Sequence, residues 1–299
     1  MTSPTPFRAG FVAVVGRPNV GKSTLVNALV GSKVAIVSRR PQTTRRRLLG
    51  VVTRPDCQVV LVDSPGLHPG GGRALNRALN AGARRAAEEA DALMLVTEAG
   101  RWEDDDERAL KLVRETGLPA VIVLNKVDRV RPRGRVLPMI EEASARHDFA
   151  AVVPISARRR DNLEGLVPEL ARLLPESPQL FPADQITDQD AAQRAAETVR
   201  EALIERLGAE LPYATYVTIE RWEEQERHRE IDAVIWVARE SQKGIVIGAG
   251  GRMAKGIGTA ARRALEAEYG GKVMLRLWVR VRPRWNEDER LLGAMGLGQ

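Results

Sequence analysis

The sequence predicts two folded parts: an α/β domain built on a mostly parallel sheet with helices on both faces, and a smaller α+β domain after it. Short apolar runs alternate with stretches of helix length in the first half, and the last third follows a different order. Between them lies a proline-bearing segment without periodicity. We therefore place the first domain at residues 1–176, a linker at 177–190 and the second domain at 191–299.

Five apolar runs are expected to form buried strands of the first domain. They are residues 11–16, 57–63, 92–98, 119–125 and 151–156. Stretches of helix length separate most of them, which is typical of parallel strands covered on both faces. Residues 48–54 lie too close to the strand at 57–63 for a crossover helix, so we expect an antiparallel hairpin there.

The second domain is predicted to begin with a helix over 191–208 that ends at Gly208. Two strands, a helix and a third strand are expected after it. Their approximate positions are 214–224, 229–240, 251–270 and 272–283.

The composition is that of an ordinary globular protein, with 43% hydrophobic and 28% charged residues. No apolar run is long enough to cross a membrane, and the N-terminus carries no secretory pattern, so we expect a cytoplasmic protein. Cys57 is the only cysteine, which excludes a disulfide framework within the chain. We interpret Cys57 as a small buried side chain.

The net charge of +7 is unevenly distributed. Residues 188–242 carry 7 basic and 13 acidic side chains, whereas residues 243–284 carry 10 basic and 2 acidic ones, so the local net charge changes from −6 to +8. A basic segment of this kind favours a polyanionic partner. The charge alone leaves nucleic acid and an anionic membrane surface as alternatives.

The stretch "GRPNVGKS" at 16–23 follows a predicted strand and opens a predicted helix. Its glycines allow successive backbone N–H groups to turn toward phosphates, and the helix N-terminus adds its dipole. Lys22 is placed to reach the β- and γ-phosphates, and Ser23 offers a hydroxyl to Mg²⁺. The expected nucleotide contacts of this loop are Gly16, Arg17, Pro18, Asn19, Val20, Gly21, Lys22, Ser23 and Thr24.

Three later stretches complete a guanine-nucleotide site. "DSPG" ends a strand, which places Asp63 beside a water of Mg²⁺ and the N–H of Gly66 at the γ-phosphate. "NKVD" places Asp128 where it accepts two hydrogen bonds from guanine, a contact that adenine cannot make. "SA" at 156–157 offers the N–H of Ala157 to guanine O6. The expected contacts of these stretches are Asp63, Ser64, Pro65, Gly66, Leu67, Asn125, Lys126, Asp128, Ser156 and Ala157.

These motifs resemble the translation-factor-like branch of the Ras-type P-loop GTPases. The resemblance implies GTP and GDP with Mg²⁺ as ligands, and hydrolysis of GTP to GDP and phosphate. A threonine in residues 38–50 should coordinate Mg²⁺, and we favour Thr44 over Thr43. The basic residues of this segment are interpreted equally well as a solvated loop or as RNA contacts. We expect Lys22, Thr44, Asp63 and Gly66 to carry catalysis, and Ser23, Thr44 and, through water, Asp63 to hold the metal.

Two positions affect the expected rate of hydrolysis. Leu67 stands where Ras-like proteins carry a glutamine that orients the attacking water, so we expect slow intrinsic hydrolysis with another group positioning the water. Asn19 matches the asparagine with which related GTPases hold K⁺ beside the phosphates. Stimulation of hydrolysis by K⁺ is therefore a hypothesis.

A second glycine-rich run, "IVIGAGGRMAKGIG" at 245–258, is predicted to hold a different phosphate. A dinucleotide pattern would need a glycine where Met253 stands. The run instead matches I-G-x-x-G between two helical segments, the loop with which a KH domain clamps single-stranded RNA, and the order of elements favours the type II variant. We expect bases to lie in an apolar groove formed by Ile245, Ile247 and Ile257, and expect Trp236 and Trp278 to be core residues. The expected RNA contacts are Lys243, Ile247, Gly248, Ala249, Gly250, Gly251, Arg252 and Lys255.

Over nearly its full length the chain resembles the Era family of bacterial GTPases. The resemblance is carried by "GRPNVGKST", "PQTTR", "DSPGLH", "NKVD", "FPADQITD", "GAELPY", "VIGAGG" and "LWVRV". It implies a GTPase that binds the 3′ end of small-subunit (16S) ribosomal RNA through its KH domain and assists rRNA processing and maturation of the small ribosomal subunit. It also implies peripheral contact with the inner membrane, and we expect a monomer. Departures from the common pattern are Ser64, Ala249 and Ala254.

Two other functions were weighed against this one. A peripheral membrane or cell-cycle regulator would use the basic surface on anionic lipid, but the sequence lacks a strongly amphipathic basic helix with aromatic anchors. A partner in tRNA modification from the same GTPase branch would lack a C-terminal KH domain.

Overall fold

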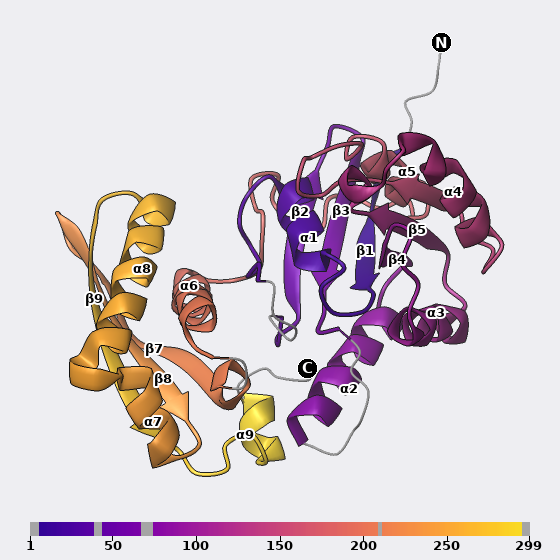
Figure 1. Ribbon diagram of the computed structural model, residues 1–299. Helices are drawn as coiled ribbons and strands as arrows, with labels where there is room; N and C mark the ends of the chain where they lie inside the picture. The colour runs from indigo at the N-terminus through magenta and orange to yellow at the C-terminus, as the bar shows by residue number, and fades with distance from the viewer. Residues whose placement is uncertain (1–5, 39–43, 67–73, 209–210, 295–299) are drawn as a thin grey trace. The chain divides into compact units, whose positions relative to one another are not determined.

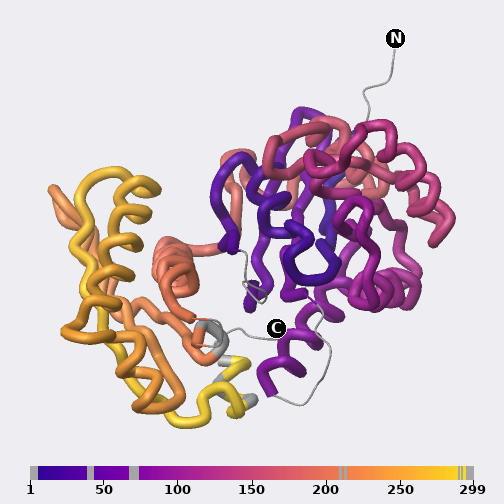
Figure 2. The backbone as a smooth tube through the Cα atoms, viewed as in Figure 1, coloured from indigo at the N-terminus to yellow at the C-terminus, as the bar shows by residue number. Residues whose placement is uncertain are grey.

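The structure is a computed structural model that describes residues 6–38, 44–66, 74–208 and 211–294. The chain divides into two compact units, the first holding most residues up to Asp188 and the second comprising mainly Gln189–Leu292. Figures 1 and 2 trace the two units along the chain. Each unit is treated by itself below.

The first unit contains a six-stranded sheet in the order β2-β3-β1-β4-β5-β6. Its strands are β1 (Arg8–Val15), β2 (Leu48–Thr53), β3 (Cys57–Asp63), β4 (Ala92–Glu98), β5 (Ala120–Asn125) and β6 (Ala151–Pro154). β2 runs antiparallel to β3, with Leu48 opposite Asp63, and the other neighbouring strands are parallel. The predicted antiparallel hairpin is thus confirmed, and only three residues separate β2 from β3.

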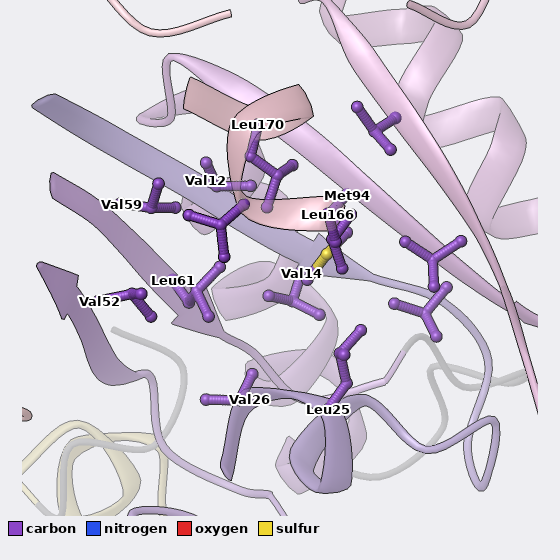
Figure 3. Close-up of a cluster of buried hydrophobic side chains, with 14 of the residues drawn as sticks. Val12, Val14, Leu25, Val26, Val52, Val59, Leu61, Met94, Leu166 and Leu170 are labelled. Carbon is purple, nitrogen blue, oxygen red and sulfur yellow. The ribbon is translucent and has the colours of Figure 1, made fainter. Parts of the chain in front are cut away.

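Helices cover both faces of this sheet. They are α1 (Lys22–Val30), α2 (Ala74–Glu88), α3 (Asp104–Thr116), α4 (Val136–Ser144) and α5 (Leu166–Ala171). Figure 3 shows one face, where Leu25 of α1 and Leu166 of α5 lie over Val14, Leu61 and Met94 of the strands. On the opposite face, residues of α3 and α4 cover the alternate positions of β1, β4 and β5. The predicted fold class is confirmed.

Cys57 is buried in the first core, as expected for a small apolar side chain. Burial raises the pKa of its thiol to about 11, with Asp56 contributing to the shift.

Much of the predicted linker is attached to the first sheet. The fully buried side-chain amide of Gln58 on β3 accepts hydrogen bonds from the N–H groups of Leu180 and Phe181 and donates to the carbonyl of Phe181. The N–H of Val51 on β2 donates to the carbonyl of Ile186 at 2.9 Å. The bond from Val51 satisfies a backbone N–H of the edge strand β2 that would otherwise remain unpaired. The segment before residue 189 is therefore held along the sheet edge.

The second unit contains a three-stranded sheet in the order β7-β8-β9, covered on one face by helices. Its elements are α6 (Ala191–Arg206), β7 (Thr215–Glu224), β8 (His228–Val237), α7 (Glu240–Ile247), α8 (Arg252–Tyr269), β9 (Lys272–Val281) and α9 (Glu289–Ala294). β7 and β8 are antiparallel, whereas β8 and β9 are parallel. The side chains of Asp190 and Gln193 form a capping box at the start of α6.

The covered face of the second sheet carries the core of this unit. Ala233 and Ile235 of β8 pack with Leu203 of α6, Val246 of α7 and Ile257 of α8. Among the described residues, no helix combines the length and the apolar character needed to cross a membrane.

One prediction about this sheet is wrong. Trp278 is not a core residue: it lies on the face that the helices leave uncovered, and 51% of it is exposed. Trp236 lies on the same face and is partly buried, with its indole N–H donating to the hydroxyl of Thr218 at 2.9 Å.

Candidate nucleotide site and RNA-binding loop

The predicted nucleotide residues meet at the carboxyl ends of the parallel strands. The loop 16–21 follows β1, Asp63 ends β3, Asn125 ends β5 and Ser156 follows β6. In open α/β sheets this edge is where ligands bind, since the loops there converge and helix N-termini point toward them. The sequence placed these residues on separate segments, and the fold brings them to one edge.

Two glycines of the 16–21 loop are required by the local geometry. Gly21 has a φ of 103°, and a Cβ built on it would lie 2.4 Å from Nδ2 of Asn125. Gly16 has a φ of 147°, and its Cβ would lie 2.3 Å from the carbonyl oxygen of Val96. Both the backbone angle and the space therefore exclude a side chain.

Lys22 is folded back over the loop. Its Nζ donates to the carbonyl oxygens of Gly16 at 2.7 Å and of Arg17 at 3.0 Å. Burial lowers the pKa of Lys22 to about 8, against the opposing influence of Asp63. Gly66 lies beside this amine, since a Cβ built on Gly66 would stand 3.2 Å from Nζ.

Three oxygen-bearing side chains meet next to Lys22. Oδ2 of Asp63 accepts hydrogen bonds from Ser23 Oγ at 2.9 Å and from Thr44 Oγ1 at 3.2 Å, and the two hydroxyls are 3.0 Å apart. The other oxygen, Oδ1 of Asp63, is buried and has no hydrogen-bond partner among the described residues. Burial raises the pKa of Asp63, because nearby positive charge only partly offsets desolvation. Hard oxygen ligands around an unsatisfied carboxylate fit Mg²⁺.

Thr44 thus lies beside Ser23 and Asp63, the two other residues predicted to hold Mg²⁺, and its role as a ligand stays a prediction. Thr43, the alternative Mg²⁺ ligand, lies outside the described residues. Leu67, which stands where Ras-like proteins carry a glutamine, also lies outside them. Ser64 and Pro65 are buried directly behind Asp63, with the hydroxyl of Ser64 3.5 Å from the carbonyl oxygen of Val14.

Asn125 connects three loops. Its Nδ2 donates to the carbonyl of Val20 at 2.8 Å, and its Oδ1 accepts from the N–H groups of Lys126 at 2.8 Å and Ala157 at 3.0 Å. The side chain is buried, so these bonds are protected from water. Asn125 therefore fixes the phosphate loop relative to both base-recognition loops.

Asp128 and Ser156 form the predicted base corner. The hydroxyl of Ser156 donates to Oδ1 of Asp128 at 2.7 Å, and this bond is the main cause that lowers the pKa of Asp128. An aspartate with its ordinary pKa is already ionised at neutral pH, and this lowering stabilises the ionised form that accepts two guanine donors. The N–H of Ala157 donates to Asn125 here, so its contact with guanine O6 stays a prediction.

Sequence reasoning missed the residues that support the phosphate loop. Arg17, expected as a nucleotide contact, points to the start of α3, where its Nε lies 2.8 Å from Oδ2 of Asp106. Glu98, at the end of β4, is 2.6 Å from Nζ of Lys126 and 3.7 Å from Nη2 of Arg17. Lys126 in turn donates to the carbonyl of Asn19 at 2.7 Å. The signal available in the sequence was the carboxylate of Glu98 as the last residue of a buried strand.

The second glycine-rich run forms a tight loop between α7 and α8. Gly248, Gly250 and Gly251 have φ values of 72°, 58° and 75°. A Cβ on Gly248 would lie 2.7 Å from Cβ of Met253, whereas Cβ atoms on Gly250 and Gly251 would meet nothing within 4 Å. The loop thus turns sharply and leaves open space beside its second half, which the approach of a sugar–phosphate backbone requires.

The side chains around this loop fit the RNA prediction in part. Arg252 and Lys255 are exposed on the first turn of α8, and Lys243 is partly exposed on α7. Ile245 is 52% exposed and is available to a base. The prediction for Ile257 is wrong: this side chain is fully buried between the helices and the sheet, because it occupies the inward face of α8.

Comparison with known proteins concerns both units of the chain. Residues 11–126 match a family described as 50S ribosome-binding GTPase, and residues 210–286 match the KH domain family. The chain is 53% identical over 296 residues to GTPase Era of Stenotrophomonas maltophilia, and the match covers 99% of each chain. The chain belongs to the Era family of GTPases. GTPase Era of Xanthomonas axonopodis pv. citri is 52% identical and covers 98% of each chain.

Solved Era structures have the same fold. An Aquifex aeolicus Era variant bound to GDP·AlF4⁻ is 37% identical, with a TM-score of 0.92 over 97% of this chain and 99% of its own. An Era structure in complex with MgGDPNP and nucleotides 1506–1542 of 16S ribosomal RNA matches with the same identity, score and coverage. The predicted family, the GTPase activity and the KH domain are confirmed.

Proposed function

We propose that this Era-family GTPase binds the unpaired 3′ end of 16S ribosomal RNA through its KH unit and assists rRNA processing and maturation of the small ribosomal subunit. One observation carries the proposal: a solved Era that superimposes on 97% of this chain holds both MgGDPNP and a 3′ segment of 16S RNA. The description of the first family names the 50S subunit, but it covers residues 11–126 alone. The 16S partner rests on a match that includes both units.

In the nucleotide site, Lys22 leaves the carbonyls of its own loop and pairs with the β- and γ-phosphates. Ser23 and Thr44 hold Mg²⁺ directly, and Asp63 holds one of its waters through the unsatisfied Oδ1. Bound there, Mg²⁺ neutralises charge that develops on the phosphates during hydrolysis. The N–H of Gly66 faces the γ-phosphate.

In the base pocket, Asp128 accepts the two guanine donors and Lys126 lies over the base plane. Asn125 keeps these groups at a fixed distance from the phosphate loop through its bond to Val20. The pocket therefore selects GTP and GDP over adenine nucleotides.

Asn19 is the residue that we propose for K⁺. Its φ of 64° turns the exposed end of the phosphate loop, and its carbonyl is held by Lys126. Hydrolysis measured in matched K⁺ and Na⁺ buffers tests this, with Asn19→Ala as the comparison. Equal turnover of the unmodified protein in the two buffers would remove the proposal.

In the KH unit, Gly248 to Gly251 give the RNA backbone access, while Lys243, Arg252 and Lys255 contact its phosphates. The experiment is binding of a labelled single-stranded RNA with the sequence of the 16S 3′ end. The double variant Gly248→Asp and Gly251→Asp should lose RNA binding and keep GTP hydrolysis. Loss of nucleotide binding together with RNA binding would mean that the two sites are not separate.

Anionic vesicles at the same salt concentration provide the second arm of that experiment. Binding to vesicles without binding to RNA would favour the membrane regulator over the ribosome-assembly factor. Because both ligands are polyanions, the salt concentration must be identical in the two arms.

The oligomeric state and the cellular location rest on the family resemblance. On that ground we propose a cytoplasmic monomer whose contact with the inner membrane is peripheral. Sedimentation equilibrium and cosedimentation with vesicles test the two statements.

A further inference from the structure

The second sheet has one face without helices, and an alternating row of side chains runs along its edge strand β9. This row, the β9 stripe, consists of Lys272, Met274, Arg276, Trp278 and Arg280. The intervening residues of β9 point the other way and join the core. Successive members of the stripe are about 6.6 Å apart, the distance that two residues span on a strand. Phosphates along an extended single-stranded RNA have a comparable spacing.

The stripe is open at its centre. Trp278 is 51% exposed and Met274 is 45% exposed, two of the few large apolar side chains that the described residues leave this accessible. At the far side of the same face, Tyr216 is covered, since its ring centroid lies 6.0 Å from that of the buried Trp285. The start of β7 is therefore covered, whereas Glu223 farther along β7 is exposed on this face. An exposed tryptophan within a sheet offers a flat surface on which a base can stack.

The charges along β9 fit an anionic ligand. The strand has three cations and no acidic residue among its ten positions. Arg280 is paired with Glu220 at 2.6 Å, and both arginines remain about half exposed. Nη1 of Arg276 lies 3.5 Å from Asp232 and 3.7 Å from Glu230, so this arginine has two carboxylate partners. Both contacts involve one nitrogen, and a guanidinium has five N–H donors, so Arg276 keeps donors for a phosphate. Exposed ion pairs of this kind contribute little to stability, so rearranging them on binding costs little.

A hollow continues the stripe at the start of β9. It has a volume of about 1000 Å³, and Met274 and Lys272 belong to both features. Arg262 and Glu266 of α8 form an ion pair at 3.5 Å in its wall, so Arg227 and Lys272 supply its excess of positive charge. The remaining lining consists of His228, Gly271 and the apolar side chains of Val273 and Leu275. A hollow of mixed apolar and polar lining suits a base.

We propose that the β9 stripe and this hollow bind a second stretch of unpaired RNA, with a base stacked on Trp278. The inference rests on the proposed function in that the same RNA occupies the glycine loop. That loop joins α7 and α8, which pack on the opposite face of the sheet. A strand that contacts both sites must therefore be longer than the roughly four nucleotides that a KH loop clamps.

The test compares two single-stranded RNAs of the 16S 3′ end, one of about four nucleotides and one of about twenty. Trp278→Ala should weaken binding of the long RNA by about five-fold or more, since a base stacked on an aromatic ring contributes at least that much. It should leave the short RNA unaffected. Trp278→Phe should retain most of the affinity, which separates stacking from misfolding. Leu137→Ala, at a side chain 66% exposed in the first unit, is the matched control and should bind both RNAs normally.

The outcomes separate this inference from the proposed function. If the unmodified protein binds neither RNA, the proposed function fails. If it binds the long RNA and Trp278→Ala binds it equally well, the second RNA site does not exist and the proposed function stands. If Trp278→Ala binds the long RNA normally but no longer binds whole small subunits, the partner of Trp278 is a protein and the RNA site is wrong.

Discussion

Arg17 of the phosphate loop and Asp106 of α3 form a buried ion pair, with Nε of Arg17 2.8 Å from Oδ2 of Asp106. Asp106 also accepts the N–H of Glu103 and thereby caps its own helix. The hydrogen bond from Glu103 holds the Asp106 carboxylate in position, and this carboxylate in turn holds Arg17 of the phosphate loop. The first turn of α3 is therefore part of the support of the phosphate site.

Asp106→Asn should lower the free energy of unfolding by roughly 1.5–3 kcal/mol, because the buried guanidinium of Arg17 loses its nearest charged partner and keeps only the more distant Glu98 and Glu103. Affinity for GDP should fall as well, since Arg17 lies in the cradle. Urea denaturation and GDP titration measure the two effects. Asp105→Asn is the control: Asp105 pairs with Arg108 at the surface, and its loss should cost less than about 1 kcal/mol. Equal losses in the two variants would contradict a special role for Asp106.

Gly21→Ala should weaken GDP binding at least about ten-fold, because the new Cβ displaces the Asn125 side chain that connects the loops. Gly31→Ala separates this collision from backbone strain. Gly31 also has a positive φ, of 79°, but a Cβ there would meet nothing within 4 Å. Both variants should lose roughly 1–2 kcal/mol of stability, and only Gly21→Ala should lose nucleotide. Equal GDP affinity of the two variants would show that GDP binding does not depend on the present position of the Asn125 side chain.

Nucleotide binding should take up a proton near pH 8.5. The pKa of Lys22 is lowered to about 8 by burial, so much of the free protein carries a neutral amine at that pH. Bound phosphates favour the ammonium and raise its pKa, so a proton enters on binding, and affinity should decline as the pH rises above about 8. Calorimetry in two buffers of different ionisation enthalpy measures the proton. Lys22→Arg is the comparison, because arginine stays charged and should show no uptake.

Asp128→Asn should weaken GDP binding by about ten-fold or more and improve binding of xanthosine diphosphate. Asparagine presents one acceptor and one donor where guanine offers two donors, whereas xanthine offers an acceptor at one of these positions. Titrations with the two diphosphates measure the change in preference, and RNA affinity should be unaffected. A parallel loss of both nucleotides would indicate damage to the pocket through Ser156, whose hydroxyl donates to Asp128.

The motif residues of the nucleotide site could be assigned from sequence because their roles are local. Gly21 must adopt a backbone angle that a side chain disfavours, and Asp63 must end a strand. Each requirement is visible in the spacing of residues within one short motif, "GRPNVGKS" for Gly21 and "DSPG" for Asp63. The order of apolar runs was enough for the same reason to predict a mostly parallel sheet with β2 as an antiparallel edge.

Only the tertiary structure decided which way the remaining side chains face. In β9, apolar residues occupy both sets of alternate positions, so the pattern does not show which set the helices cover. The helices α6, α7 and α8 cover the set that contains Leu277, so Trp278 of the other set is exposed. Ile257 of α8 is buried against the covered face. Likewise, Arg17 could have pointed to the nucleotide, but Asp106, 89 residues later in the chain, holds it against α3. The local spacing of residues determines the conformation of the backbone, whereas the burial and ion pairing of a side chain depend on which segments distant in the sequence pack against it.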